Sequence, residues 1–464
     1  MLDKRKRTTM VRLVLAGRGL RAFADGYLAV LLPAYLLAIG HDQLDLGLLA
    51  TVTLLGSAAA TLAVGRWGGR FDLRRLLMAS AIAMAASGLG FASATTLWPL
   101  LLVGFMAPMN LGGSDVSIFL PLEHSTLAAS GDADFRTRVF ARYSFVGSLA
   151  GACGALLVAL PDWLGRQGGW QVAEALRIMF LLYAAIGLLV WLLYSRLPPP
   201  NLAPPASARP GGSVVLGSSR AIVTRLAGLF AVDAFAGGLI INAMLALWLF
   251  QRFGISLTAA GTLLFWTGIL SATSQLVAPS LSQRIGLVNT MVFTHIPSSL
   301  CLIGAAFAPT LELAVGLLLV RSLLSQMDVP ARSAYVMSIV APAERPAAAS
   351  VTAVARSLAS AVGPVLAGAW FASGDMVAPL VLCGVLKIGY DLALFTGFRR
   401  VPVLVDPDEL AVPPAKPDSP EPDPRGAPEP GFRSAPEPDV QNGADSLEPS
   451  LQEQVVAGGA QGRE

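Results

Sequence analysis

Charged residues are scarce in this sequence: Asp, Glu, Lys and Arg make up 14% of 464 residues, while hydrophobic residues make up 54%. Soluble domains carry about 25% charged residues, so this composition excludes an ordinary water-soluble protein. Cysteine and histidine are also rare, with three of each scattered singly along the chain. A disulfide framework and a metal site built from paired ligands are therefore not expected.

Motifs of soluble enzymes and of pumps are missing as well. The sequence has no Gly-x-x-x-x-Gly-Lys-Ser/Thr loop, which would cradle the phosphates of a nucleotide. It also offers no arrangement of a nucleophile with a base. We therefore expect neither an enzyme nor an ATP-driven pump, and no cofactor or nucleic-acid partner.

Long apolar runs are what the sequence has in abundance. Blocks of about 20 to 28 residues match the length that an α-helix needs to cross a hydrocarbon core about 30 Å thick. They predict an all-α polytopic membrane protein with twelve transmembrane helices. The expected spans are 14–39, 44–65, 76–95, 97–123, 138–160, 173–195, 221–250, 258–281, 288–308, 311–340, 347–371 and 376–398.

Basic residues mark one set of loops, among them those that hold Arg74, Arg196, Arg284 and Arg399, while the alternate loops hold few. Because cytoplasmic loops retain Lys and Arg, both termini are expected in the cytoplasm. Arginine outnumbers lysine, and alanine and glycine abound, as in proteins of GC-rich bacteria. We therefore expect the protein in the inner (plasma) membrane. We also expect it to be a monomer in contact with membrane lipids.

The composition also divides the chain. A basic N-terminus at 1–13 precedes a six-helix bundle at 14–195, and a Pro-rich cytoplasmic linker at 196–220 leads to a second bundle at 221–398. The tail at 399–464 is rich in Pro, Asp, Glu and Gly and nearly lacks aromatic residues. Such a segment cannot bury a core, so the tail is expected to be disordered.

The two bundles look like copies of one unit. Asp115-Val116 and Asp328-Val329 lie 213 positions apart, and Gly47 and Gly261 lie 214 apart. An even number of spans separates the copies, so both have the same orientation. A duplicated six-helix unit around a central cavity is typical of secondary transporters.

The loop after the second span carries a further signal. Gly65, Arg70 and Arg74 match a Gly-x-Leu-Ala-Asp-Arg-x-Gly-Arg-Arg pattern, although Gly69 stands where Asp is usual. The sequence thereby resembles the major facilitator superfamily of secondary transporters over about residues 14–398. The resemblance implies transport by rocking of the two halves around a central cavity.

A second resemblance concerns the fifth span. Gly147, Gly151 and Gly154 are similar to the Gly-rich fifth-helix motif of drug-exporting members of that superfamily, with Ala152 where Pro is expected. Small residues also allow ordinary close helix packing. This motif is the one feature of the resemblance that favours export over import.

Four charged residues fall deep inside expected spans: Asp25, Asp233, Arg321 and Asp328. A charge at mid-bilayer costs at least about 2.5 to 3.5 kcal/mol, so each needs a partner, a water-filled cavity or a function. Asp25 has Arg21 one turn earlier, whereas Asp233 has no local partner. We expect Asp233, and then Asp25, to carry a coupling proton or a cationic substrate; the alternative is a permanently paired structural carboxylate.

Other residues within the spans are weaker candidates. Arg321 either binds an anionic substrate group or neutralises Asp328 or Asp233. Pro330 is expected to kink the tenth helix beside Asp328. The i,i+4 spacing of Lys387 and Asp391 predicts that they neutralise each other. Asn110, Asp115 and Gln275 are further candidates for the cavity wall.

Charges near the cytoplasmic ends suggest a gate. Asp115 and Glu123 in the fourth span are expected within reach of arginines, forming ion pairs that break when the cavity opens inward; solvated interfacial charge is the alternative. Arg142 and Arg356 have a simpler alternative, in which their long side chains extend to the membrane surface. The candidate gating residues are Arg70, Arg74, Asp115, Glu123, Arg142 and Arg284.

Together these features predict a secondary transporter that moves a small solute by alternating access, coupled to protons and directed to export. A proton-coupled uptake carrier for an organic anion, with Arg321 as the anchor, is the alternative within transport. A non-transporting membrane sensor whose acidic tail binds a partner is the alternative from another class.

Overall fold

The structure is a computed structural model that describes residues 4–67, 71–111, 117–128, 133–198, 217, 219–340, 344–399 and 401. Most of the expected linker and almost all of the expected tail lie outside these residues. So do two expected gating residues, Arg70 and Asp115.

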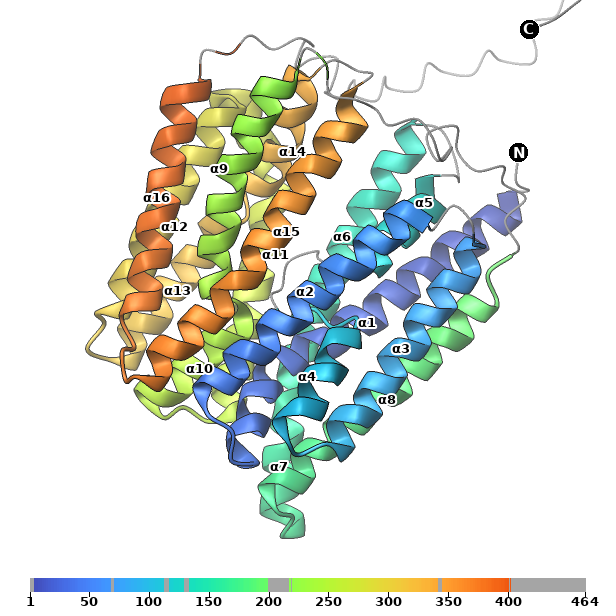
Figure 1. Ribbon diagram of the computed structural model, residues 1–464, viewed down its shortest axis with the longest axis vertical. Coiled ribbons are helices and arrows are strands. Elements are labelled where there is room, and N and C mark those ends of the chain that lie inside the picture. The colour runs from blue at the N-terminus through green and yellow to red at the C-terminus, as the bar shows by residue number, and fades with distance from the viewer. Residues whose placement is uncertain are drawn as a thin grey trace, which may run out of the picture. The chain divides into compact units, whose positions relative to one another are not determined.

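All regular structure in these described ranges is helical (Figure 1). The helices are α1 (Lys4–Ala38), α2 (Gln43–Trp67), α3 (Leu73–Ser93), α4 (Leu97–Met106), α5 (Phe119–Ala128), α6 (Ala133–Ala155), the 3₁₀ turn η2 (Leu156–Val158), α7 (Ala159–Gly168), α8 (Val172–Ser195), α9 (Arg220–Leu239), α10 (Asn242–Phe253), α11 (Leu257–Ile285), α12 (Leu287–Ala306), α13 (Leu311–Ser325), α14 (Asp328–Ile339), α15 (Arg345–Ala372) and α16 (Ala378–Phe398).

Short polar or glycine signals separate the apolar helices. The carboxylate of Asp72 accepts the backbone N–H of Arg74 at 3.0 Å and caps α3. Ser256 caps α11 in the same way by accepting the N–H of Ala259 at 3.1 Å. Gly286 alone links α11 to α12 at a φ of 88°, a conformation that a residue with a Cβ rarely adopts.

Eleven helical segments in the described part of the chain are long and apolar enough to cross a membrane. The fourth expected span is the exception, because two short helices, α4 and α5, replace a single helix over 97–123. Helix α4 stops just before Pro108, and Ala107 is extended with a ψ of 126°. A proline ring disfavours helical backbone in the residue before it, which explains where α4 ends.

Two more spans are also interrupted. The seventh breaks at Ile240 and Ile241 between α9 and α10, and the tenth breaks at Gln326 and Met327 between α13 and α14. Pro330 would clash with the carbonyl of residue 326 in a continuous helix, and it lies in the first turn of α14. The expected distortion of the tenth helix beside Asp328 is therefore present as a break.

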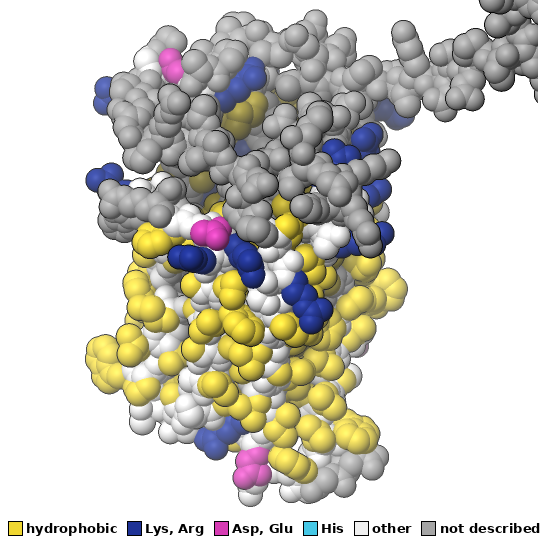
Figure 2. All heavy atoms as spheres, turned by 90° about the vertical axis from the view of Figure 1, so that its right-hand side faces the viewer, with side chains coloured by type: hydrophobic (Ala, Val, Ile, Leu, Met, Phe, Trp, Pro, Cys, Tyr) yellow, Lys and Arg dark blue, Asp and Glu magenta, His cyan; other side chains and the backbone are white. Residues whose placement is uncertain are grey.

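The outer surface is apolar over a broad band. Figure 2 shows hydrophobic side chains covering the middle of one face, with Lys and Arg gathered toward one end. Large hydrophobic side chains such as Trp98, Leu102 and Leu276 are at least 64% exposed. Such surface is stable in lipid and not in water, so the fold is that of a multi-pass membrane protein.

Helices α1–α8 and α9–α16 form two halves that meet along α2 with α15, α6 with α11, and α1 with α10. We call the end where α1 begins and α16 ends the terminal face, and the other end the opposite face. Near the opposite face, a Cβ added to Gly47 would lie 2.5 Å from the carbonyl oxygen of Pro364. The backbone N–H of Val365 donates to the hydroxyl of Thr51 at 3.1 Å.

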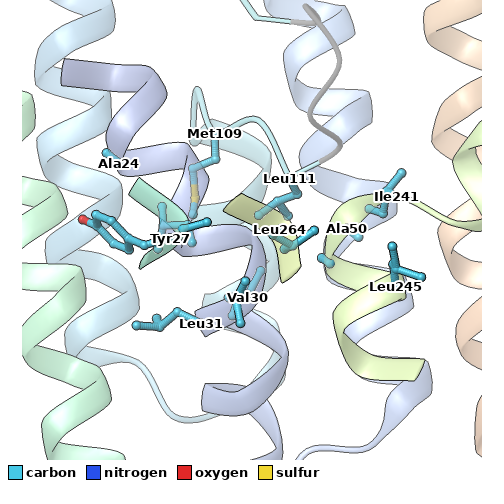
Figure 3. Packing of buried hydrophobic residues seen from close by; sticks show 14 of the residues in the cluster. Ala24, Tyr27, Val30, Leu31, Ala50, Met109, Leu111, Ile241, Leu245 and Leu264 are labelled. Atoms are coloured by element: carbon cyan, nitrogen blue, oxygen red, sulfur yellow. The ribbon is translucent and has the colours of Figure 1, made fainter. Parts of the chain in front are cut away.

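A shared hydrophobic cluster joins the halves in the same region. Val30 and Leu31 of α1 lie in one cluster with Ile241 and Leu245 of the second half (Figure 3). Helix α10 is fixed here because the indole N–H of Trp248 donates to the carbonyl oxygen of Met376 at 2.9 Å. These contacts close the bundle toward the opposite face.

Candidate transport site

Asp233 of α9 lies at the centre of a buried ionic network in the second half. Its Oδ1 is 2.6 Å from the ammonium of Lys387 on α16, and its Oδ2 is 3.0 Å from the guanidinium of Arg332 on α14. All three side chains are at most 12% exposed. One carboxylate is thus held by two cations from two other helices, in surroundings where water cannot replace either partner.

The network continues on both sides of Asp233. Arg332 also pairs with Asp328 at 3.1 Å, one turn earlier on α14. On the other side, Nδ1 of His295 on α12 lies 3.1 Å from both carboxylate oxygens of Asp391. Its Nε2 lies 3.4 Å from the ammonium of Lys387. This geometry fits an imidazole that donates from Nδ1 to Asp391 and accepts from Lys387.

These contacts overturn two expectations. Asp233 was expected to have no partner on its own helix and to carry a proton or a cationic substrate, with a permanently paired carboxylate as the alternative. It has two partners on other helices, and Arg332 rather than Arg321 neutralises it. Lys387 and Asp391 were expected to neutralise each other, yet Lys387 binds Asp233 and Asp391 binds His295. The i,i+4 spacing identified a local pair, but side chains from neighbouring helices compete for the same charges.

The first half holds a separate polar cluster around Glu123 of α5. This carboxylate is fully buried and accepts hydrogen bonds from the guanidinium of Arg21 and the hydroxyls of Tyr143 and Tyr194. The donors come from α1, α6 and α8, so Glu123 ties the short α5 to three longer helices. A buried, hydrogen-bonded carboxylate of this kind fixes helix positions.

Glu123 was expected in a gate with arginines near the membrane surface, but its partner is Arg21 inside the same half. Arg74 instead donates to the backbone carbonyl oxygen of Ser195. Arg142 and Arg284 are exposed, with no ion pair to a described residue. The expected partner Asp115 lies outside the described residues.

Asp25 of α1 has a different environment from Asp233. Its side chain is half-buried, and its Oδ1 accepts the backbone N–H of Asn110 at 3.3 Å. Asn110 belongs to the non-helical stretch after α4, so the interruption of the fourth span supplies this donor. Arg21, the expected local partner of Asp25, is held by Glu123 instead.

Two remaining candidates lie elsewhere. Arg321 of α13 is half-buried and lies within electrostatic reach of Cys301 and Cys383, without an ion pair to a described acidic residue. Gln275 of α11 is half-buried beside the fully buried Ser274. Among the described residues, no three His, Cys, Asp or Glu side chains are arranged to hold a metal ion.

Sequence reasoning missed much of this site. It named neither Arg332 nor His295 as partners of the acidic residues, and it did not name the tyrosines around Glu123. The available signal was their polarity at membrane depth, because a buried His, Arg or Tyr also needs a partner. That signal identifies candidates but not which residue each of them contacts.

In the described part of the chain, eleven helices that are long and apolar enough to cross a membrane pack into two interlocking halves, and each half has ionic side chains buried inside it. The chain belongs to the Major Facilitator Superfamily, which matches residues 14–236 and 226–438. Membership makes the protein a transporter rather than an enzyme. The predicted fold class, with its two six-helix repeats, is thereby confirmed.

Similar proteins include the uncharacterized membrane protein YJR124C of Saccharomyces cerevisiae, which is 22% identical over 84% of this chain and 94% of its own length. Among solved structures, a bacterial homologue of the human lysosomal transporter Spinster, in an inward-facing and unoccupied conformation, has a TM-score of 0.66 at 18% identity. It covers 84% of this chain and 97% of its own.

The nucleoside transporter NupG has a TM-score of 0.65 at 15% identity and covers 84% of this chain and 99% of its own. The inward-open xylose transporter XylE of E. coli has a TM-score of 0.64 at 14% identity, covering 86% and 99%. These likenesses concern the fold.

Proposed function

We propose that the protein exports a small solute by alternating access and that proton binding at Asp25 drives the export. Both termini lie in the cytoplasm in this proposal, and the protein resides in the inner membrane of a bacterium. The observation that carries the proposal is the contrast between Asp25 and the two carboxylates at the centres of the buried networks, Asp233 and Glu123.

Asp25 can change its protonation state at a smaller structural cost than Asp233 or Glu123. Its described partner is one backbone N–H, whereas Asp233 contacts two cations and Glu123 contacts an arginine and two tyrosines. Protonating Asp233 would leave Lys387 without a counter-ion, and protonating Glu123 would do the same to Arg21, which is strongly unfavourable. The order expected from the sequence, with Asp233 first, is therefore reversed here.

Asp25 lies beside a close contact between α1 and α6, which a change in its charge could shift. A Cβ added to the adjacent Gly26 would lie 2.0 Å from the carbonyl oxygen of Gly151, so α1 and α6 touch backbone to backbone. A Cβ added to Gly154 would likewise lie 1.9 Å from the carbonyl oxygen of Phe23. A change of charge at Asp25 would therefore act directly on the α1–α6 contact.

The same contact supports the direction of transport. Gly151 and Gly154 form the fifth-helix motif that is similar to that of drug-exporting members, and here it packs against the helix that carries Asp25. Export is accordingly the direction that we propose.

Uptake of an organic anion is the second candidate, and Arg321 favours it. Because no acidic residue of the described chain pairs with this half-buried guanidinium, it is available to an anionic solute. This candidate predicts solute movement inward with protons.

The test uses the purified protein in proteoliposomes. Solutes from a chemically broad panel are first screened for uptake into inverted vesicles under an imposed proton gradient. We then expect Asp25→Asn to abolish accumulation against a gradient while exchange of labelled for unlabelled solute persists. Asp375→Asn, in the exposed loop before α16, is the matched control and should accumulate solute normally.

Undiminished accumulation by Asp25→Asn would remove Asp25 as the coupling residue. Loss of preloaded solute from the inverted vesicles under the same proton gradient would favour the uptake carrier. If Asp25→Asn lost both accumulation and exchange while remaining folded, Asp25 would serve solute binding instead of coupling.

A further inference from the structure

Arg356 of α15 is a half-buried cation for which the fold provides no counter-ion. Its Nε is buried and without a hydrogen-bond partner. No acidic side chain of the described residues forms an ion pair with its guanidinium. Arg21 and Arg74 also have an unpartnered Nε, but their terminal nitrogens have the acceptors described above. Arg177 and Arg345 share with Arg356 the lack of a described acceptor, but of these three only Arg356 lies within electrostatic reach of Asp233 and Asp328.

Its position on α15 places it near the ionic network of the second half. Arg356, Ser360 and Pro364 follow one another at i,i+4 and share a face of the helix. The carbonyl of Ser360 meets Gly238 of α9, and that of Pro364 meets Gly47 of α2. The Ser360 contact therefore lies within the second half and the Pro364 contact at the seam, and Arg356 lies about 12 Å along α15 from the Pro364 contact, toward the terminal face.

The charges nearest to Arg356 are already engaged. Arg332, Asp233 and Asp328 are close enough to interact with it electrostatically. However, Asp233 is held by Arg332 and Lys387, and Asp328 is held by Arg332. These two carboxylates and two cations balance one another, and Asp391, the remaining carboxylate of the network, contacts His295. None of the three carboxylates forms an ion pair with Arg356.

An arginine at the centre of a membrane helix costs about 2.5 to 3.5 kcal/mol even on insertion scales, unless something compensates its charge. Extension to the membrane surface does not remove this cost, because the guanidinium stays beside the buried network. A guanidinium binds carboxylate and phosphate groups through paired N–H donors, which makes an anion the fitting ligand.

We propose that Arg356 binds the anionic group of the transported solute, which makes the substrate a small organic anion. This inference rests on the proposed function for the claim that the bound anion is transported. The binding site itself does not depend on the direction of transport or on proton coupling.

The experiment measures thermal unfolding of the purified full-length protein in nanodiscs of phosphatidylcholine, which carries no net charge. The probes are benzoate, succinate and inorganic phosphate, with tetraethylammonium as the cationic comparison. We expect at least one organic anion to raise the Tm saturably, and tetraethylammonium to have no effect.

Arg356→Gln should lower the affinity of the protein for that anion by at least about tenfold, because charge-assisted hydrogen bonds are lost. Arg356→Lys should retain part of the effect, since a point charge remains. Arg225→Gln, an exposed arginine on α9, is the matched control and should bind as the unmodified protein does.

Three results would overturn the proposal: no saturable effect of any anion on the unmodified protein, an equal effect on Arg356→Gln, or stabilisation by the cation alone. Nanodiscs of phosphatidylglycerol, an anionic lipid, show whether Arg356 binds a lipid headgroup or a soluble anion. If only that anionic lipid stabilises the protein through Arg356, the ligand is the membrane and the substrate assignment is wrong.

The two proposals fail separately. Asp25→Asn should bind the anion normally and lose only coupling to the proton gradient. Normal anion binding with undisturbed coupling in Asp25→Asn would refute the proton site and leave the anion site intact. Loss of coupling in Asp25→Asn, together with unchanged anion binding in Arg356→Gln, would support the proton site and refute the anion site.

Discussion

Gly47 on α2 offers a direct test of how the two halves close. It meets α15 near the opposite face, where an added Cβ would lie 2.5 Å from the carbonyl oxygen of Pro364 and 3.1 Å from the Cα of Val365. Both neighbours are backbone atoms, so a change of side-chain rotamer cannot relieve the clash. We expect Gly47→Val to wedge α2 and α15 apart.

The size of the effect follows from the geometry. Non-bonded heavy atoms prefer separations of about 3.5 to 4.0 Å, so the helices must move apart by about 1 Å. Overpacking of this kind costs about 1 to 3 kcal/mol. Because the cost falls on the conformation sealed at the opposite face, its population relative to other conformations should drop by about 5- to 150-fold.

The assay is a distance measurement between two spin labels at the opposite face. Thr96→Cys and Ala372→Cys place one label on each half, both at exposed positions, and the native cysteines are first replaced by alanine. The short-distance population should fall in Gly47→Val, with a smaller change in Gly47→Ala. Gly65→Val is the control, because nothing lies within 4 Å of a Cβ at that position of α2.

An unchanged distance distribution in a folded Gly47→Val protein would refute the reasoning. So would an equal change in Gly65→Val, because the effect would then come from valine in α2 and not from the contact with α15.

Three further substitutions test the buried contacts, each by thermal unfolding of the purified protein. Asp233→Asn should cost about 3 to 5 kcal/mol because it removes the shared counter-ion; adding Lys387→Met should restore part of this. Glu123→Gln should cost about 3 kcal/mol or more, and full stability would show that its three hydrogen bonds are not made. Trp248→Phe should cost about 1 kcal/mol through the lost bond to Met376, and a larger loss would indicate a packing role.

The helices could be predicted because their signal is local. An apolar run of sufficient length must be helical in lipid, where each backbone N–H needs a partner within its own segment. The boundaries of α2 and α8 accordingly fall within two residues of their expected ends. The fourth span was predicted as one helix because it is mostly apolar, although it holds Asn110 and Asp115, while the interruption depends on Pro108.

The candidate site was predictable only in part. Asp25, Asp233 and Asp328 stood out because charge is costly in a membrane, and that cost can be read from one residue and its neighbours. The partners could not be read in this way. Arg332 and Lys387 reach Asp233 from helices 99 and 154 positions further along the chain.

The sequence by itself therefore determined the membrane environment, the helical fold class, the internal repeat and the short set of residues whose charge requires a reason. The tertiary structure decided how those charges are shared. Lys387 binds Asp233 rather than its neighbour Asp391, Glu123 takes Arg21 from Asp25, and Arg356 is left without a counter-ion. The physical reason is that a buried charge selects its partner by distance in space, and helix packing sets that distance.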